Sequence, residues 1–539
     1  MGDELRARGF DLPEAVVGRT VFDLIKRQAE LRPDALAFCA ASAFGGEHRL
    51  NYGEFRLRAE ALACGLLKLK IRFQDRVGIM MDNDAGLEAG ITMMALHRLG
   101  LVVVPINTRF AAEEIVYVLN KAQCVAVVAT TELACKLSSL TAQIPSLRSI
   151  IAVGADVTPP HLDWRELALA SDHGATATWP DVSVDAMSEI LFTSGTTAHP
   201  KGAVMTHARS VTSAYGFAAA MSLVSDDVYE SFFPFFTTAQ LHCVLLPAWW
   251  AGAAAVLDSR FDLPAILARM QREKTTKYIG APTFYAFLLD SYDPAAHDLS
   301  HLRMFDYGGA PMSVDVIARL SKIYPHVELR QTYGMTESGP AGTVLRGEDS
   351  LSKLGSVGRP WPLTEVRIAD DSGAILPAHA LGEIEIRSPT VMREYHDQPE
   401  LTAATFHDGW LRTGDLGYLD DDGFLYHVDR KKDMIIRGGH NIGSLEVEEA
   451  FFRHPAVLEA SVVSVPHPKL GEDIHAFVVR RPGHEIDVAI LRAFCSDKLA
   501  DYKIPRLITF VDELPRGPMG KVLKSKLRDA ARDLASKGT

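Results

Sequence analysis

Residues 76–129 decide the fold class, and they read RVGIMMDNDAGLEAGITMMALHRLGLVVVPINTRFAAEEIVYVLNKAQCVAVVA. Three short apolar bursts stand in this stretch, at 76–81, 101–105 and 124–129, and helical stretches lie between them. Short apolar runs that alternate with helices are typical of parallel strands in an α/β unit. We therefore predict one α/β unit over residues 20–190, which begins with helices at 21–31 and 52–67.

The α/β pattern continues and then changes along the chain. Residues 188–330 repeat it, with a strand at 190–192 and a helix at 263–273. After about residue 340, short alternating strands such as 382–387 predict a small antiparallel β subdomain. The acidic clusters 370–373 and 420–423 lack the ligand spacing of an EF-hand loop, so we interpret them as hairpin turns.

A run of five charged residues, 429–433, precedes a second α/β pattern with helices at 445–453 and 486–499 and strands at 457–465 and 476–479. We place the domain boundary there, which divides the chain into residues 1–429 and 430–539.

Bulk composition limits the classes of protein that this chain can belong to. It has 539 residues, of which 47% are hydrophobic and 23% charged, which predicts a soluble protein of two or more domains. A formal net charge of −12 argues against nucleic acid as a partner. Six scattered cysteines predict free thiols in the cytoplasm. The longest apolar run, 244–257, contains Pro247 and is short for a membrane span, so we expect buried core there.

The segment Phe192-Thr-Ser-Gly-Thr-Thr-Ala-His-Pro-Lys-Gly202 is the first that carries chemistry. Its hydroxyls and backbone N–H groups can donate to phosphate oxygens, and Lys201 adds a positive charge. It is not a Walker loop, because Gly202 follows the lysine where Ser or Thr would stand. The alternative is a solvated turn, since Thr, Ser and Gly are ordinary turn residues.

This segment resembles the signature loop of the adenylate-forming superfamily, which includes acyl-CoA synthetases, aryl-CoA ligases, luciferases and the adenylation domains of peptide synthetases. Similar segments follow in order over nearly the whole chain; one departure is Ala198, where glycine is more usual. The resemblance implies a large N-terminal domain, made of two α/β subdomains and a small β-barrel subdomain. It also implies a small mobile α+β C-terminal domain.

Three further segments complete the nucleotide site that the resemblance implies: 307–311 (YGGAP), 331–338 (QTYGMTES) and 410–417 (WLRTGDLG). In the family, such residues stack on adenine (Tyr333), touch the α-phosphate (Thr336), help to hold Mg²⁺ (Glu337) and bind the ribose hydroxyls (Asp415). The implied ATP or AMP site comprises Thr193, Ser194, Gly195, Thr196, Thr197, Lys201, Gly309, Ala310, Pro311, Gln331, Thr332, Tyr333, Gly334, Met335, Asp415 and Arg430, with Glu337 and Thr196 at the metal.

Two lysines have roles implied by position. The segment 515–524 (PRGPMGKVLK) resembles the family's terminal Gly-Lys segment, which makes Lys521 the catalytic lysine beside Thr336 and Glu337. The alternative is one more surface lysine in a basic tail. Lys432 falls at the family's hinge position, although a charged run is usually a solvated surface.

The acyl pocket is assigned to the aromatic segment 232–242 (FFPFFTTAQLH) and its surroundings, namely Phe235, Phe236, Thr237, His242, Pro282 and Gly308. An apolar, aromatic lining favours an aliphatic or aryl acid. Core packing is the alternative for the phenylalanines, and a structural role is the alternative for His242. Gly438, Gly439 and His440 resemble the segment that lines the family's pantetheine tunnel, and Gly443-Ser444 replaces a frequent Tyr-Pro.

These assignments imply an enzyme that uses ATP and Mg²⁺ to convert a small carboxylic acid to an acyl-adenylate, releases pyrophosphate and passes the acyl group to coenzyme A. An amide-forming ligase, an acyl-AMP ligase that serves a carrier-protein thiol and a luciferase-like oxygenase remain alternatives. A catalytically inactive nucleotide-binding protein would have lost Lys521, Glu337 or Asp415, and all three are present. A homodimer is a further hypothesis.

Overall fold

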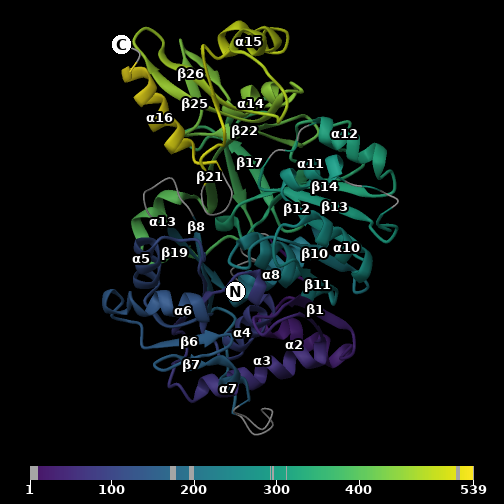
Figure 1. The fold of residues 1–539 in the computed structure, drawn as a ribbon, viewed down its shortest axis with the longest axis vertical. Helices are drawn as coiled ribbons and strands as arrows, with labels where there is room; N and C mark the ends of the chain where they lie inside the picture. Colours follow the sequence, from purple (N-terminus) through teal and green to yellow (C-terminus); the bar gives the residue numbers. More distant parts are fainter. Residues whose placement is uncertain are drawn as a thin grey trace.

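The structure is a computed structural model that describes residues 10–169, 178–193, 200–291, 293, 296–310, 312, 314–516 and 522–537. A large body holds the N-terminal and central residues, and the C-terminal elements form a smaller lobe at the top of Figure 1. The chain is thus divided into two parts, as the sequence pattern predicts. None of the described helices combines the length and the apolarity that a membrane crossing needs.

The first sheet has eight strands in the order β19-β9-β8-β4-β3-β5-β6-β7. Strands β3 to β8 pair in parallel, whereas at one edge β9 pairs antiparallel with β8 and β19 pairs antiparallel with β9. The apolar bursts of the sequence form its centre, which confirms the predicted strands. The bounds are β3 Arg76–Met80, β4 Val102–Pro105, β5 Cys124–Thr130, β6 Ser149–Val153, β7 Leu162–Asp163, β8 Met187–Thr193, β9 Lys201–Thr206 and β19 Glu394–Tyr395.

The second sheet has nine strands in the order β16-β15-β14-β13-β12-β10-β11-β1-β2. Its bounds are β1 Leu36–Ala41, β2 Glu47–Asn51, β10 Val228–Ser231, β11 Ala254–Leu257, β12 Lys277–Gly280, β13 Met304–Gly308, β14 Glu328–Gly334, β15 Gly342–Leu345 and β16 Arg359–Pro360. Strands β1 and β2 lie within the span 20–190 but belong to this sheet, so the expectation of one contiguous unit there is wrong. Strand pairing is chosen by long-range contacts, which local periodicity does not report.

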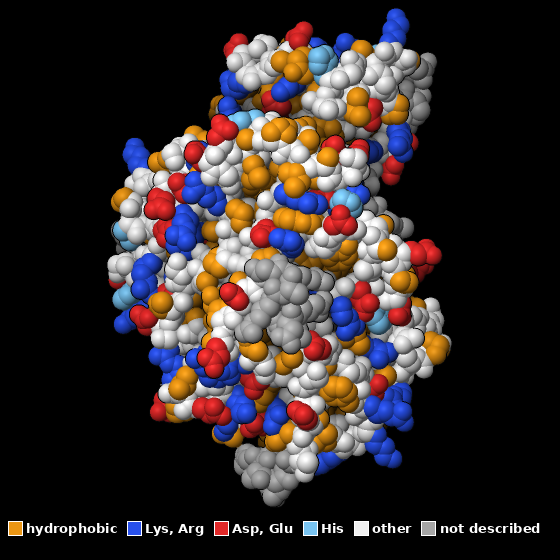
Figure 2. All heavy atoms as spheres, turned by 180° about the vertical axis from the view of Figure 1, so that it is seen from behind, with side chains coloured by type: hydrophobic (Ala, Val, Ile, Leu, Met, Phe, Trp, Pro, Cys, Tyr) orange, Lys and Arg blue, Asp and Glu red, His pale blue; other side chains and the backbone are white. Residues whose placement is uncertain are grey.

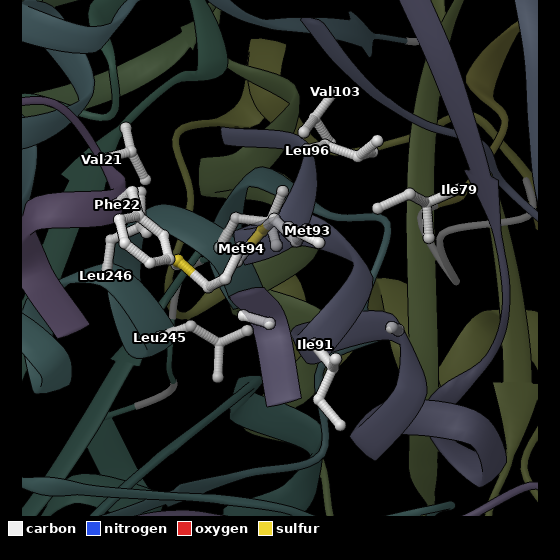
Figure 3. Close-up of a cluster of buried hydrophobic side chains, with 14 of the residues drawn as sticks. Val21, Phe22, Ile79, Ile91, Met93, Met94, Leu96, Val103, Leu245 and Leu246 are labelled. Atoms are coloured by element: carbon white, nitrogen blue, oxygen red, sulfur yellow. The ribbon is translucent and has the colours of Figure 1, made fainter. Parts of the chain in front are cut away.

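Helix α4 (Gly86–Arg98) is buried on all sides because it lies between the two sheets. Figure 3 shows Met93 and Met94 of this helix among apolar side chains from other elements, including Phe22, Leu245 and Leu246. The close approach depends on small residues: a Cβ atom on Gly90 would lie 2.6 Å from the Phe38 ring. The core therefore joins both sheets into one body.

The other helices of the large body flank these sheets. They are α2 Phe22–Leu31, α3 Tyr52–Leu67, α5 Ala112–Ala122, α6 Thr131–Ser138, α7 Trp164–Leu169, α8 His207–Ala220, α9 Leu246–Ala251, α10 Leu263–Glu273, α11 Pro282–Ser291, α12 Val314–Ile323 and α13 Pro399–Thr405. A π-helix, Ala239–Leu245, runs directly into α9. The apolar run 244–257 is largely buried there, as predicted.

The third sheet is antiparallel, with the order β17-β18-β21-β20 and β22 paired to β21. Its bounds are β17 Glu365–Ala369, β18 Gly382–Arg387, β20 Phe406–His407, β21 Trp410–Leu419 and β22 Leu425–Arg430. Residues 420–423 form the turn between β21 and β22, and 370–373 form a turn after β17, which confirms both turns. Closure of these strands into a barrel stays a prediction.

The C-terminal lobe is an α+β unit. Its sheet has the order β24-β23-β26-β25, with β27 parallel to β26. The bounds are β23 Ile435–Arg437, β24 His440–Ile442, α14 Ser444–Phe452, β25 Val457–His467, β26 Gly471–Arg480, α15 Val488–Ser496, β27 Leu507–Val511 and α16 Lys524–Lys537. Figure 2 shows basic and acidic side chains interspersed over the face seen from behind, so the net charge forms no single-sign patch on that face.

Candidate active site

The predicted phosphate loop connects two adjacent antiparallel strands. Strand β8 ends at Thr193 and β9 begins at Lys201, and these two residues are paired across the ladder. Ser194, Gly195, Thr196 and Thr197 lie outside the described residues. The loop therefore leaves the carboxyl end of a strand that is parallel to β4, which is the edge of an α/β sheet where ligands typically bind.

Glu337 lies beside the end of β8, in the short helix Thr336–Ser338, and is buried. The Tyr395 hydroxyl donates to its Oε1 atom at 2.8 Å, and the Thr193 hydroxyl donates at 3.4 Å. Burial and the Glu337 carboxylate both raise the pKa of Tyr395, so its hydroxyl keeps its proton and remains a donor. Lys201 Nζ lies 5.5 Å from the centre of the Tyr395 ring.

The Glu337 carboxylate has no cationic partner within the part of the chain that the structure describes. No Lys or Arg nitrogen in the described ranges lies within 4.0 Å of it. A buried carboxylate normally requires compensation by a positive charge. A hard cation such as Mg²⁺, which prefers oxygen ligands, fits this position.

Tyr333 of β14 and Asp415 of β21 meet through a hydrogen bond. The Tyr333 hydroxyl donates to Asp415 Oδ2 at 2.9 Å, and Arg430 Nε lies 3.2 Å from Asp415 Oδ1. His427 Nε2 is 3.8 Å from Asp415 Oδ2. Burial opposes ionisation of Asp415, but these neighbours outweigh it and hold its pKa below the ordinary value. Asp415 is thus an ionised acceptor in a shielded position.

The segments predicted to bind adenine lie at the carboxyl ends of two parallel strands, β13 and β14. Tyr307 is paired with Gln331, and Gly308 is paired with Thr332. A Cβ atom on Gly308 would lie only 2.6 Å from Thr332 Oγ1, so the pairing depends on glycine. Gly309, Ala310 and Gly334 are exposed at this edge, Met335 is half-buried, and Pro311 lies outside the described residues.

The aromatic segment 232–242 divides between core and site. Phe235 is fully buried in the main core, and its N–H donates to Asn83 Oδ1 at 2.8 Å. Phe236 and Thr237 are also buried, and the Thr238 hydroxyl lies 2.9 Å from that of Thr336. Core packing, the other interpretation of these phenylalanines, thus describes Phe235, whereas Thr238 in the middle of the segment reaches the Thr336–Ser338 helix.

A partly exposed aromatic cluster adjoins the segment. Phe232 contacts Phe261 and Phe284, with ring centroids 5.3 and 5.9 Å apart, and Phe261 contacts Phe287 at 5.7 Å. About half of the surface of Phe261 and Phe287 is exposed, at 45% and 50%. Phe287 belongs to α11, which begins at the predicted pocket residue Pro282, and Phe261 packs against this helix. Phe261 and Phe287 are isolated phenylalanines without a local sequence signal, so sequence reasoning did not select these two residues.

The predicted coenzyme A residues form the turn of a hairpin in the C-terminal lobe. Gly438 and Gly439 have φ values of +59° and +86° between β23 and β24, which favours glycine at both positions. The His440 ring stacks on Tyr502 at 4.3 Å. All three predicted residues are exposed, and Lys432 lies exposed between β22 and β23, whereas Lys521 lies outside the described residues.

Sequence reasoning missed three residues at the centre of the site: Tyr395, His427 and Thr238. Each contacts a predicted residue, namely Glu337, Asp415 and Thr336. Thr238 adjoins a predicted residue and His427 lies close to Arg430, so both had a weak signal. Tyr395 stands in a short edge strand without a recognisable pattern.

Comparison with known proteins agrees with this geometry. The AMP-binding enzyme family matches residues 25–396, and the AMP-binding enzyme C-terminal domain matches residues 446–521. The chain belongs to the AMP-binding enzyme family. Together the two matched regions extend over most of the length of this AMP-binding enzyme and over both of its lobes.

Relatives of this AMP-binding enzyme cover nearly its whole length. A feruloyl-CoA synthase of Amycolatopsis is 34% identical and aligns over 93% of the chain and 97% of its own length. A (7a-methyl-1,5-dioxo-octahydroindenyl)propanoyl:CoA ligase of Rhodococcus jostii (strain RHA1) is 35% identical over 90% of the chain and 94% of its own length. The crystal structure of the anthranilate CoA ligase AuaEII with anthranoyl-AMP is similar at a TM-score of 0.89 and 27% identity, over 98% and 99% of the two chains.

Proposed function

We propose that this enzyme activates a carboxylic acid with ATP and then transfers the acyl group to coenzyme A, with release of pyrophosphate and AMP. The observation that carries the proposal is the position of Glu337. Among the residues that the structure describes, this buried carboxylate has no cationic partner, and it lies where the end of β8, the Thr336–Ser338 helix and β19 meet. Membership of the AMP-binding enzyme family supports the same reaction.

In the first step, the substrate carboxylate attacks the α-phosphorus of ATP, and the bond from phosphorus to pyrophosphate breaks. Negative charge spreads over the phosphoryl oxygens in the transition state, so fixed donors and cations there lower the barrier. Thr336 would donate to the α-phosphate, Lys201 would face the pyrophosphate side and Lys521 would lie between the carboxylate and the phosphate. Tyr333, Asp415 and Arg430 would orient adenine and ribose.

Glu337, with Thr196 of the loop, would hold Mg²⁺ through oxygen ligands. The ion, when bound, neutralises charge on the phosphate oxygens. The hydroxyls of Thr193 and Tyr395 would keep the Glu337 carboxylate oriented toward the loop, because both donate to the same oxygen atom.

In the second step, the thiol of coenzyme A attacks the acyl carbonyl, and AMP leaves. We propose that Lys432 is the hinge between an N-terminal domain, 1–429, and a C-terminal domain, 430–539. The exposed hairpin with Gly438 and Gly439 supports this step, because two glycines leave room for a narrow pantetheine chain. The His440 side chain would flank it.

The acid is proposed to be aliphatic or aryl. The aromatic cluster of Phe232, Phe261, Phe284 and Phe287 offers an apolar surface beside Pro282, Gly308 and the end of the aromatic segment. The relatives named above are a feruloyl-CoA synthase and a (7a-methyl-1,5-dioxo-octahydroindenyl)propanoyl:CoA ligase, and the acyl groups in both names contain a carbocyclic ring. A homodimer stays a prediction, as does the cytoplasm, which the six free cysteines support.

The decisive test is a panel of carboxylic acids incubated with ATP and Mg²⁺ and scored for pyrophosphate, and then repeated with coenzyme A or with amines. We expect acid-dependent pyrophosphate release and a thioester product when coenzyme A is present. An amide product without a thioester would favour the amide-forming alternative. Absence of pyrophosphate with every acid would contradict adenylation itself.

A further inference from the structure

A fully buried carboxylate, Glu189 of strand β8, lies between two fully buried histidines. Its Oε2 atom is 2.6 Å from Nε2 of His242, and its Oε1 atom is 3.6 Å from Nε2 of His97. The Ser210 hydroxyl donates to Oε2 at 3.3 Å. Burial raises the pKa of Glu189, but His242 and His97 outweigh it and hold the pKa below its ordinary value, so the carboxylate is charged and paired.

This carboxylate connects elements that are distant in sequence. Glu189 belongs to the strand that leads into the phosphate loop, and His242 belongs to the π-helix Ala239–Leu245. His97 comes from α4, and Ser210 comes from α8. The other ring nitrogen of His242, Nδ1, lies 3.3 Å from the Ser213 hydroxyl of α8. Both nitrogens of His242 are thus engaged, which fixes the ring in one orientation.

Each of the two main partners leads directly into the candidate active site. Along β8, Thr193 stands four residues after Glu189 and reaches Glu337 at 3.4 Å. The π-helix begins directly after Thr238, whose hydroxyl lies 2.9 Å from that of Thr336. The Glu189–His242 contact therefore links two segments, β8 and the start of the π-helix, which both reach the Thr336–Ser338 helix.

We propose that Glu189 is a positioning residue for adenylation. Through its contact with His242 it fixes β8 and the π-helix relative to each other, next to the proposed acyl pocket. This inference rests on the proposed function. A buried contact between a carboxylate and a histidine is weak evidence for a stabilising role, because apolar side chains of similar size often replace even buried ion pairs without loss of stability. It does impose a fixed geometry, and a displacement of about 1 Å can cost roughly a hundredfold in rate.

The inference also gives His242 a specific role. The sequence places it in the acyl pocket, but its exposed fraction is zero and its two nitrogens face Glu189 and Ser213. We infer that His242 acts on the substrate through the π-helix and the residues before it rather than by direct contact.

The test uses the full-length enzyme with an acid that the wild type activates. Glu189→Gln keeps the volume and removes the charge, and His242→Gln removes the partner. We expect pyrophosphate release to slow by about ten- to a hundredfold in both variants, with a raised KM for the acid. The KM for ATP should rise less than the KM for the acid, because Tyr333 and Asp415, which are proposed to hold adenine and ribose, lie outside the network. The double variant should lose no more than either single variant, since both break the same pair.

The matched control is Asp227→Asn. Asp227 is another fully buried carboxylate, paired with Lys277 at 3.2 Å and with Arg303 at 2.7 Å. We expect this variant to melt at a lower temperature without a change in KM for the acid. Equal behaviour of Glu189→Gln and Asp227→Asn would overturn the positioning role, as would a parallel rise in both KM values.

Milder variants keep the proposal testable if Glu189→Gln does not fold. Ser210→Ala removes one hydrogen bond to the carboxylate, and Glu189→Asp keeps the charge on a shorter side chain. Both should show the same selective rise in KM for the acid to a smaller extent; an unchanged ratio of the two KM values would contradict the inference. A wild-type enzyme that releases no pyrophosphate with any acid would instead count against the proposed function.

Discussion

At the scale of single residues, Glu337 is the strongest case. Substitution by Gln keeps the side-chain volume and an acceptor oxygen for the Tyr395 hydroxyl, but it removes the negative charge. We expect pyrophosphate release to fall by roughly a hundredfold or more, because the ligand for a cation that stabilises the transition state is lost. Unfolding by heat should be little affected. A variant with normal turnover at low Mg²⁺ would show that Glu337 holds no metal.

His207 carries the clearest dependence of stability on pH. It is fully buried beside His97, and burial lowers its pKa from 6.5 to about 3. The unfolded chain therefore binds more protons than the native one between these two values, so stability is present above pH 6.5 and is lost as the pH falls toward 3. The upper limit of this effect is about 5 kcal/mol.

The test of this prediction is denaturant unfolding at about pH 7 and about pH 5, with His207→Gln as the comparison. The wild type should lose stability on acidification, and the variant should lose clearly less. An identical slope in both proteins would mean that other groups carry the acid sensitivity.

At the scale of elements, the pairing of β13 with β14 limits the side chains that position 308 tolerates. A Cβ atom on Gly308 would lie 2.8 Å from the Thr332 carbonyl oxygen as well as 2.6 Å from its hydroxyl. We expect Gly308→Ala to part the strands, to cost about 1–3 kcal/mol of stability and to raise the KM for ATP. The checks are thermal unfolding and an ATP titration.

Gly216 in α8 is the control, because a Cβ atom there would meet only the Pro362 carbonyl oxygen, at an ordinary 3.7 Å. Gly216→Ala should fold normally and bind ATP as the wild type does, since alanine favours a helix. If both glycine variants lost ATP affinity equally, the close contact at Gly308 would not be the cause.

At the scale of the whole molecule, a hydrogen bond between Ser444 and Asp429 joins segments on either side of the proposed hinge. The Ser444 N–H donates to the buried carboxylate of Asp429, and Lys524 contacts the Ser444 hydroxyl and lies 2.9 Å from Glu448. Ser444 is the first residue of α14, a position that accepts proline. We expect Ser444→Pro to leave the helix intact, to remove the N–H and to speed tryptic cleavage at Arg430 to Lys432.

Ser444→Ala is the matched control for this prediction, because it keeps the N–H and loses only the hydroxyl. Its cleavage rate should stay near that of the wild type. A rate as high as that of Ser444→Pro would assign the effect to Lys524 rather than to the contact with Asp429.

The C-terminal lysine belongs to the same scale, since it would have to reach the site from the other lobe. Lys521→Ala should slow adenylate formation strongly and leave most of the fold intact, because it removes a positive charge needed in the transition state. The measurement is pyrophosphate release beside thermal unfolding. Near-normal release by this variant would rule out the assigned role.

Prediction from the sequence succeeded for the ranges of helices and strands and failed for some of the tertiary contacts that they make. Helix Tyr52–Leu67 and strand Cys124–Thr130 match the expected ranges closely, because their apolar spacing is local. Strands β1 and β2 lie within the span 20–190, which was predicted as one unit, but they pair in the second sheet, and Phe235, which was predicted to line the acyl pocket, is buried in the core. Both depend on contacts with residues far along the chain.

The sequence by itself determined the α/β class, the two-part chain and the family, because periodicity, turn residues and short motifs are local properties. Only the tertiary structure decided that Tyr395 and Thr193 share the Glu337 carboxylate and that Glu189 joins His242. The physical reason is that a buried charge acquires its state and its role from neighbours brought together by packing, and those neighbours stand more than fifty residues away in the chain.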